Sequence, residues 1–194
     1  MISIKSEREI ELMRIAGSIV GDTHKYLQKY IKPGITTAEL DELAYNYIIS
    51  RNATPSFKGY EGFPGTICAS INEEVVHGIP GKTKLREGDI ISIDIGACYK
   101  GYHGDSAWTY PVGKISKQKQ DLLKHTEESL FAGLSVIKEG ARIGDIGYAV
   151  SSVANKYHLG VVKELVGHGV GTSVHEAPDV PNYGKQNNGP VLKA

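Results

Sequence analysis

The sequence has little of what marks a secreted or membrane-bound protein. It contains two cysteines, Cys68 and Cys98, among 194 residues, which are too few for a disulfide framework and do not have the spacing of a zinc knuckle. No apolar run approaches the roughly 18 to 20 residues of a membrane span, and Met1 is followed by charged, helix-forming residues rather than by a signal peptide. We therefore expect a cytoplasmic protein with reduced thiols and no membrane partner.

The chain also lacks net charge. Its 22 basic and 22 acidic residues cancel, so the composition does not favour nucleic acid or an anionic membrane as a partner. The hydrophobic content of 40% indicates a folded globular chain, long enough for one large domain or two fused halves. Glycine is abundant, and the 23 glycines gather around His and Asp residues. This pattern indicates tight turns and close backbone approach near a site.

The stretch 88–110 is strongly apolar and yet carries Asp94 and Asp105. Its β-branched residues predict two strands joined by a turn at Lys100-Gly101. A two-residue loop there places Asp105 opposite Gly96, on the same face as Asp94, with Gly96 leaving space between the two carboxylates. That face offers no Lys or Arg, and two desolvated carboxylates would repel each other. The pattern predicts a divalent cation held by both; a hydrated edge strand is the alternative.

Helical periodicity and capping signals predict four helices arranged as two similar pairs. Aligning 31–34 with 137–140 gives an offset of 106 residues and repeats the order long helix, turn, second helix. We interpret this as an internal duplication. The predicted helices cover 6–31, 36–52, 117–137 and 143–158, and short strands are predicted at 66–71 and 160–165.

The duplication predicts one domain, residues 1–194, made of two related halves, about 1–113 and about 114–194. The same offset places a counterpart of the Asp94 hairpin at about 196 to 216, past Ala194. We therefore expect the second half to be incomplete.

Two histidines stand out because they lie among glycines. His168 and His175 are seven residues apart in a segment containing Gly-His-Gly, where the flanking residues leave the ring open to a ligand. His24, His125 and His158 fall on predicted helices and are expected to be ordinary structural side chains. The His-Glu-x-x-His and Gly-x-Ser-x-Gly patterns and the phosphate loops are absent.

Five motifs together resemble the type I methionine aminopeptidases over essentially the whole chain. They are VHGIP at 76–80, SIDIG at 92–96, YHGDSA at 102–107, GHGVG at 167–171 and VHEAP at 174–178. The resemblance implies the α+β pita-bread fold, a curved antiparallel sheet covered by helices in two pseudo-symmetric halves, here with its last strands missing. It also implies hydrolytic removal of the initiator methionine from nascent polypeptides at the ribosome, in the cytoplasm and by a monomer.

The resemblance further implies a site with two divalent metal ions. Asp94 would chelate one ion, Asp105 would bridge the two, and His168 would bind the second. Co, Mn, Fe and Zn all suit such ligands. His77 would meet the substrate just past the scissile bond, and His175 would hydrogen-bond the scissile peptide and help to stabilise the tetrahedral intermediate.

Three further residues match the apolar pocket that receives the methionine side chain in this family. They are Tyr60, Phe63 and Cys68, and a thioether favours aromatic and sulfur contacts. Ordinary core packing is the alternative interpretation.

The sequence departs from the family at its end. The last two metal ligands of the family are glutamates, one of which also acts as general base, and both would lie beyond Ala194. We expect weak metal binding and a turnover at least ~100-fold below that of a complete relative. Equal turnover would make Glu164 and Glu176 the first replacements to examine.

Two other functions stay open from the sequence. A prolidase-like or X-Pro aminopeptidase would share the fold, but it usually has an extra N-terminal domain for which this chain has no room. A non-catalytic pita-bread binding protein would have no use for the two aspartates and three histidines of the expected site.

Overall fold

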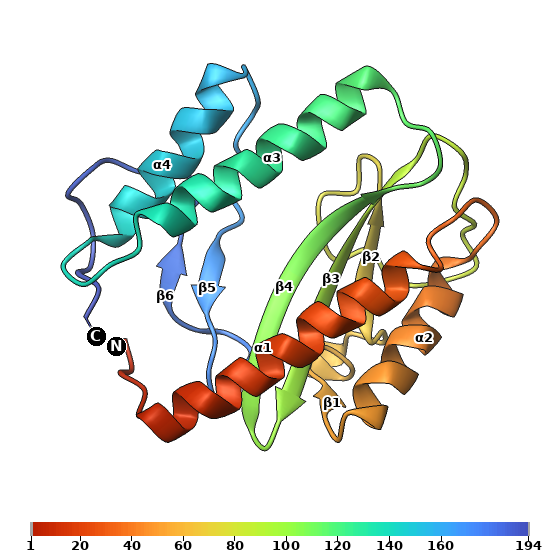
Figure 1. Ribbon diagram of the computed structural model, residues 1–194, viewed down its shortest axis with the longest axis horizontal. Helices are drawn as coiled ribbons and strands as arrows, with labels where there is room; N and C mark the ends of the chain where they lie inside the picture. Colours follow the sequence, from red (N-terminus) through yellow and green to blue (C-terminus); the bar gives the residue numbers. More distant parts are fainter. Residues whose placement is uncertain (1, 194) are drawn as a thin grey trace. The chain divides into compact units, whose positions relative to one another are not determined.

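The computed structural model describes residues 2–193, which form two compact units (Figure 1). The first unit contains Lys5–Ser116 and Val170–Val174. The second unit contains Lys117–Gly169 and the residues from His175 onward, together with the first residues up to Ile4. Each unit has its own pair of helices and its own sheet. The organisation as a single domain of two halves stays a prediction.

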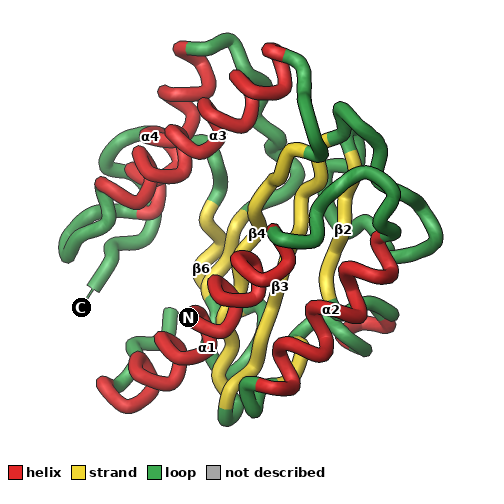
Figure 2. The backbone as a smooth tube through the Cα atoms, turned by 45° about the vertical axis from the view of Figure 1, so that its right-hand side comes forward, coloured by secondary structure: helices red, strands yellow, loops and turns green. Residues whose placement is uncertain are grey.

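The first unit is an antiparallel sheet with two helices on one face (Figures 1 and 2). Strand β4 pairs with one edge of β3 along its whole length, so β1 and β2, which pair with opposite ends of β3, share the other edge. The elements are α1 (Glu7–Gln28), α2 (Thr37–Ser50), β1 (Thr54–Pro55), the short helix η1 (Tyr60–Gly62), β2 (Ile67–Ile71), β3 (Ile90–Tyr99) and β4 (Tyr102–Pro111).

The turn between β3 and β4 sets the register of the hairpin. Lys100 and Gly101 both have positive φ, 50° and 85°, which is the geometry of a two-residue type I′ turn. The turn pairs Gly96 with Asp105 and Asp94 with Ala107. The register predicted from the sequence is confirmed.

Alternation along β3 separates the core from the opposite face. Ile91, Ile93 and Ile95 are fully buried and belong to a core that includes side chains of both helices. On β4, Gly104 allows α1 to approach closely, because a Cβ there would lie 2.6 Å from the Gly17 nitrogen. Because successive side chains of a strand point to opposite faces, Asp94, which lies between Ile93 and Ile95, points to the other face of the sheet.

His24 joins α1 to β4. Its Nε2 lies 3.0 Å from the carbonyl oxygen of Ser106, and its Nδ1 lies 3.1 Å from the Tyr110 hydroxyl. Because a carbonyl only accepts, Nε2–H donates to Ser106 and Nδ1 accepts from Tyr110. Burial lowers the pKa of His24, so the ring is a neutral structural side chain, as the sequence predicts.

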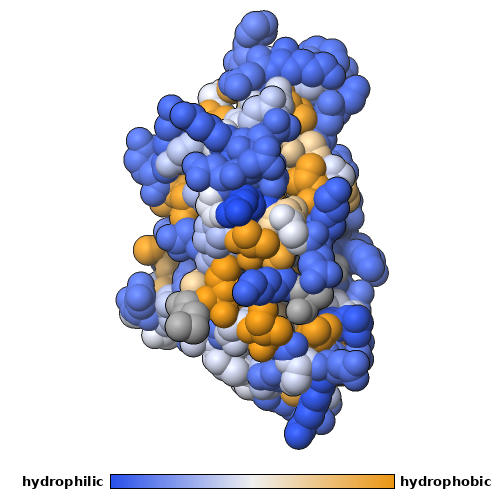
Figure 3. Space-filling model, turned by 90° about the vertical axis from the view of Figure 1, so that its left-hand side faces the viewer, coloured by the Kyte–Doolittle hydropathy of each residue, from blue (hydrophilic) through white to orange (hydrophobic). Residues whose placement is uncertain are grey.

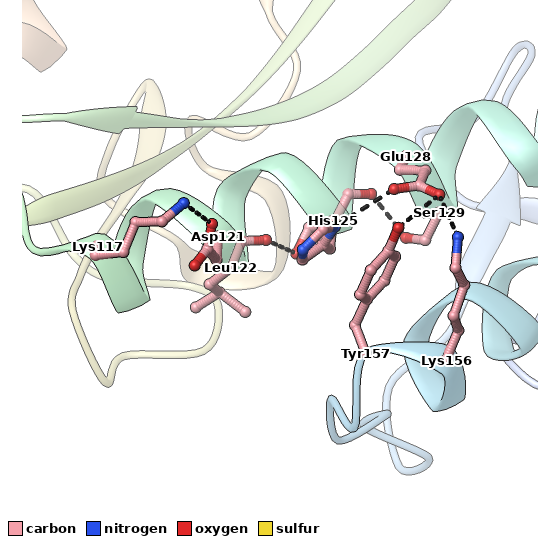
Figure 4. A network of polar contacts seen from close by, with 9 residues as sticks. Lys117, Asp121, Leu122, His125, Glu128, Ser129, Lys156 and Tyr157 are labelled. Carbon is pink, nitrogen blue, oxygen red and sulfur yellow. Dashed lines mark hydrogen bonds and ion pairs between the residues drawn. The ribbon is translucent and has the colours of Figure 1, made fainter.

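The second unit consists of α3 (Lys117–Ser135), α4 (Ile143–Lys156), β5 (Gly167–Gly169) and β6 (Glu176–Val180). Glu128 on α3 links the two helices (Figure 4). It accepts a 3.4 Å hydrogen bond from the Tyr157 hydroxyl and lies 3.7 Å from Lys156 Nζ. His125, which contacts the same carboxylate, stacks on Tyr157 with ring centroids 3.4 Å apart.

The strand predicted at 160–165 is wrong. The first strand of the second unit begins at Gly167 instead. Within residues 2–193 the predicted segment has no partner strand, and Val162 and Leu165 are 43% and 40% exposed. A short apolar run therefore did not suffice to make a strand without a pairing edge.

The helix pairs of the two units repeat the same hydrogen bonds. Helix α4 begins and ends 106 residues after α2. Gly34, before α2, donates to Leu85 O at 2.8 Å, and Gly140, before α4, donates to Leu192 O at 3.0 Å. Both glycines have positive φ, 97° and 84°. These contacts agree with the duplication predicted from the sequence.

Some apolar side chains of the second unit are exposed. On α3 they include Leu130, Phe131 and Leu134, which are 44%, 54% and 49% exposed. Figure 3 shows hydrophobic residues gathered among hydrophilic ones on one face of the protein. No helix within residues 2–193 has both the length and the hydropathy needed to cross a bilayer.

Candidate metal and substrate site

Asp94 and Asp105 form a close carboxylate pair on the face of the sheet opposite α1 and α2. Burial, the negative charge of Asp94 and a hydrogen bond with Asp94 together raise the pKa of Asp105 to about 8. At neutral pH and without a metal, the pair therefore holds a proton that one carboxylate alone would have lost. The same-face placement predicted from the sequence is confirmed by the register of β3 and β4.

The space above Gly96 is occupied, which corrects the prediction that this glycine leaves room between the carboxylates. A Cβ at Gly96 would lie 2.6 Å from the Phe57 ring and 2.8 Å from Ser56 Cβ. Ser56 N also donates a 2.9 Å hydrogen bond to Gly96 O. The glycine is thus needed for the close approach of the 56–57 segment to the sheet.

An apolar cluster lies beside the carboxylates. It consists of the buried residues Phe57, Cys68 and Val174 with Phe63 packed against them, and we call it the Phe57 cluster. Cys68 is the cross-strand partner of Asp94. Burial and the charges of Asp94 and Asp105 raise the pKa of the Cys68 thiol to about 12, so the thiol stays protonated.

The structure brings together two of the three predicted pocket residues, Phe63 and Cys68. The third, Tyr60, is on η1 and is 37% exposed. Its backbone N–H donates to Phe57 O at 2.9 Å, so it follows the cluster in the chain but is not one of its buried members.

Sequence reasoning missed two members of the Phe57 cluster. Phe57 lies in the loop rich in glycine and aromatics at 55–64, which was a usable signal. Val174 immediately precedes His175, and the segment that carries it is attached to β4 through a 2.8 Å hydrogen bond from His103 N to Gly171 O. Nothing in the local sequence indicates that contact.

His77 lies in the exposed loop that follows β2. Its backbone has φ of 59°, an uncommon conformation for a residue other than glycine. The next residue, Gly78, accepts a 2.8 Å hydrogen bond from Ala69 N, and a Cβ on Gly78 would lie 2.4 Å from Ala69 O. Gly78, the neighbour of His77, is therefore held against Ala69 of β2, the residue after Cys68.

In the second unit, the structure brings His168 and His175 together, with ring centroids 4.1 Å apart. His168 Nδ1 lies 2.9 Å from Gly169 O. Because the carbonyl accepts, Nδ1 carries the proton in the neutral ring and Nε2 keeps its lone pair. A hydrogen bond of this kind orients an imidazole to bind a metal through its other nitrogen.

The donor groups have the chemistry of a hydrolytic metal site. Within residues 2–193, no group of three or more His, Cys, Asp and Glu side chains is placed to hold a metal ion. The two aspartates belong to the first unit and His168 belongs to the second. Half-buried carboxylates and an oriented imidazole are ligand types that suit divalent metals of the first transition row. A cation bound by Asp94 and Asp105 would replace the proton that the pair retains.

A surface hollow lies elsewhere on the first unit. It is lined by residues at the start of α1 together with Lys100 and Tyr102. None of the predicted site residues lines it, so it does not bear on the chemistry of the carboxylate pair.

Carboxylates and imidazoles are the kinds of ligand that hold the metal in metal-dependent hydrolases. The family model of Metallopeptidase family M24 matches residues 11–194. The chain therefore belongs to metallopeptidase family M24, and membership of this family implies divalent metal ions.

Within the family, the relatives identify the group more narrowly. Methionine aminopeptidase 1 of Bacillus subtilis is 56% identical over 193 residues, which are 100% of this chain and 78% of that protein. The crystal structure of methionine aminopeptidase from Rickettsia prowazekii matches with a TM-score of 0.98 and 39% identity, over 100% of this chain and 78% of that chain. The chain is thus one of the methionine aminopeptidases, and the predicted pita-bread fold is confirmed.

A more distant neighbour shares the fold alone. The Xaa-Pro dipeptidase from Bacillus anthracis matches with a TM-score of 0.83 and 24% identity, over 97% of this chain and 51% of that chain. At this identity the match does not support the prolidase-like alternative.

Proposed function

We propose that the protein removes N-terminal methionine from nascent polypeptides by metal-dependent hydrolysis of the first peptide bond. One observation carries the proposal: the Phe57 cluster lies directly beside the half-buried carboxylate pair, because Cys68 is the cross-strand partner of Asp94. A side chain held by the cluster would present its peptide bond to the metal ligands. The 56% identity to a methionine aminopeptidase supports the same function.

Asp94, Asp105 and His168 would hold two divalent ions. Asp94 and Asp105 would contribute carboxylate oxygens to the ions, and His168 would contribute Nε2. Co, Mn, Fe and Zn each suit this set of ligands. When bound, such an ion supplies a water of lowered pKa and polarises the scissile carbonyl. Asp105 would contribute by releasing its proton when a cation binds the carboxylate.

The Phe57 cluster would supply specificity for methionine. Full burial of a side chain of this size is worth about 1.5 to 3 kcal/mol, and aromatic rings make favourable contacts with a thioether sulfur. Phe57, Phe63 and the protonated Cys68 thiol provide these surfaces. Tyr60, which is partly exposed, would contact the ligand at the edge of the cluster.

The two histidines outside the metal set would contact the peptide. His77 would meet the chain just past the scissile bond, and His175 would donate a hydrogen bond to the scissile peptide as charge develops on its oxygen. We also propose that the enzyme acts as a monomer in the cytosol, where nascent chains leave the ribosome.

The test is methionine release from a Met-Ala-Ser peptide in the presence of Mn²⁺ or Co²⁺. We expect release that a chelator abolishes and that Asp105→Asn reduces by at least ~100-fold, because loss of a ligand group removes the activated water. Asp22→Asn is the matched control, since Asp22 is a surface carboxylate that pairs with Lys25 and Arg51. Equal release by Asp105→Asn, or release that survives the chelator, would contradict the proposal.

A further inference from the structure

Ser56 and His103 make a side-chain contact between the loop at 55–64, which carries Phe57 and Phe63, and the strand β4, which carries Asp105. Ser56 Oγ lies 2.8 Å from His103 Nδ1, and the contact is partly buried. His103 precedes Asp105 by two residues on β4, so both side chains lie on the same face of the sheet. The contact joins segments that are 47 residues apart in the chain.

His103 also holds a second segment through its backbone. Its N–H donates to Gly171 O at 2.8 Å, within the segment Val170–Val174 that is part of the first unit. Val174, at the end of this segment, packs in the Phe57 cluster. His103 therefore contacts two segments outside the sheet that contribute residues to the Phe57 cluster. These are the loop that carries Phe57 and the segment that carries Val174.

The position of Phe57 depends on this attachment. After Ser56, whose N–H still bonds Gly96 O on β3, the chain leaves the sheet. Gly59, Tyr60 and Phe63 then donate or accept hydrogen bonds within their own segment. Ser56 lies at the junction, with its N–H on Gly96 O and its hydroxyl on His103. A shift of Ser56 would move the Phe57 ring from its place above Gly96.

We propose that His103 is a positioning residue that fixes the shape of the Phe57 cluster through its hydrogen bond to Ser56. That the cluster binds methionine rests on the proposed function. The positioning of the cluster by His103 depends only on the fold. A fixed cluster selects the unbranched methionine side chain over a branched one of similar size, because a branched side chain requires the Phe57 wall to move.

The first test compares Ser56→Ala with the parent enzyme on peptides that begin with methionine or leucine. We expect kcat/KM for the methionine peptide to fall about 5- to 10-fold, mainly through KM, as for loss of one hydrogen bond. The preference for methionine over leucine should fall as well. Ser56→Thr, which keeps the hydroxyl, should restore both values, and Mn²⁺ affinity should stay that of the parent.

The second test does not require turnover. Amide hydrogen exchange of residues 59–63 should be several-fold faster in Ser56→Ala and in His103→Asn, while exchange in β2 and β3 stays unchanged. Ser50→Ala is the matched control, because Ser50 also loses one hydroxyl hydrogen bond, to Tyr47 O, but lies on α2.

The outcomes separate the two proposals. Absence of methionine release by the parent enzyme with any metal would overturn the proposed function, and the exchange measurement would still decide the role of His103. Parent-like exchange of residues 59–63 in both variants would overturn the positioning role, as would unchanged preference in an active Ser56→Ala enzyme.

Discussion

Asp105 is a carboxyl group that the fold keeps protonated near neutral pH. Its burial is the largest cause, and the neighbouring Asp94 charge adds to it. A carboxyl group binds a metal as the carboxylate, so if Asp105 is a metal ligand as proposed, metal binding and proton release are coupled at this residue. The affinity of the site for a divalent ion should therefore increase with pH up to about 8.

The raised pKa of Asp105 makes the stability of the metal-free protein depend on pH. In the unfolded chain this group titrates near its ordinary value of 3.8, and in the folded chain at about 8. The folded state therefore binds the proton more tightly, so this contribution to stability is fully present below pH ~4 and is lost as pH rises through 8. We expect the free energy of unfolding, measured by urea titration with a chelator, to fall between pH 5 and pH 9.

Asp105→Asn removes the titrating group and retains its shape. The variant should lose the fall in stability between pH 5 and pH 9, while other groups continue to titrate in both proteins. A parallel fall in the two proteins would show that Asp105 titrates normally in the folded state.

At the scale of single residues, sequence reasoning succeeded where the information is local. The same-face placement of Asp94 and Asp105 follows from strand alternation and a two-residue turn, both visible within 88–110. The space above Gly96 was misjudged because Ser56 and Phe57, which fill it, come from a loop about 40 residues earlier. The roles of Asp94, Asp105 and the histidines in binding metal or substrate stay predictions.

At the scale of elements, the contact between α1 and β4 depends on a glycine. A Cβ on Gly104 would lie 2.6 Å from Gly17 N and 2.7 Å from the Ala16 carbonyl carbon, both backbone atoms. Neither can rotate away, so the helix and the strand would have to separate. We expect Gly104→Ala to lower the free energy of unfolding by about 1 to 3 kcal/mol, as for other overpacked contacts.

Gly17→Ala is the matched control for this measurement by denaturant titration. A Cβ on Gly17 has no neighbour within 4 Å, and alanine favours the helix by roughly 0.5 to 1 kcal/mol over glycine. The two substitutions add the same methyl group on opposite sides of one contact and should change stability in opposite directions. Destabilisation of equal size by both would show that the contact is looser than described.

The elements also show where periodicity was sufficient and where it was not. The helix α2 begins after Thr36 with the predicted capping box, in which Thr36 and Glu39 bond each other's backbone N–H. This signal is local and was read correctly. The strand expected at 160–165 failed because a strand requires a partner, and pairing is decided by parts of the chain that the local pattern does not describe.

At the scale of the whole molecule, the repeated hydrogen bonds make a matched comparison possible. Gly34 and Gly140 occupy equivalent turns with positive φ, and a Cβ on either has open space around it. Alanine at each position should therefore cost only the backbone strain, roughly 1 to 2 kcal/mol. We expect similar losses of unfolding free energy for Gly34→Ala and Gly140→Ala.

Amide exchange would show where each loss acts. Gly34→Ala should increase exchange in the first unit and Gly140→Ala in the second, if each turn stabilises its own helix pair. Gly160→Ala, at a glycine of ordinary φ with open space, should change neither unit. Strongly unequal losses at Gly34 and Gly140 would indicate that the repeated turns no longer have equivalent structural roles.

The membership of Val170–Val174 in the first unit has a consequence for synthesis. The ribosome completes Lys5–Ser116 well before it reaches this segment. At elongation rates of about 5 to 20 residues per second, the delay is roughly 3 to 11 s. During that interval the outer edge of β4 lacks Gly171 as the acceptor for His103, and the Phe57 cluster lacks Val174. The nascent chain therefore exposes an unfinished sheet edge for seconds, long enough for a chaperone to bind before Val174 completes the Phe57 cluster.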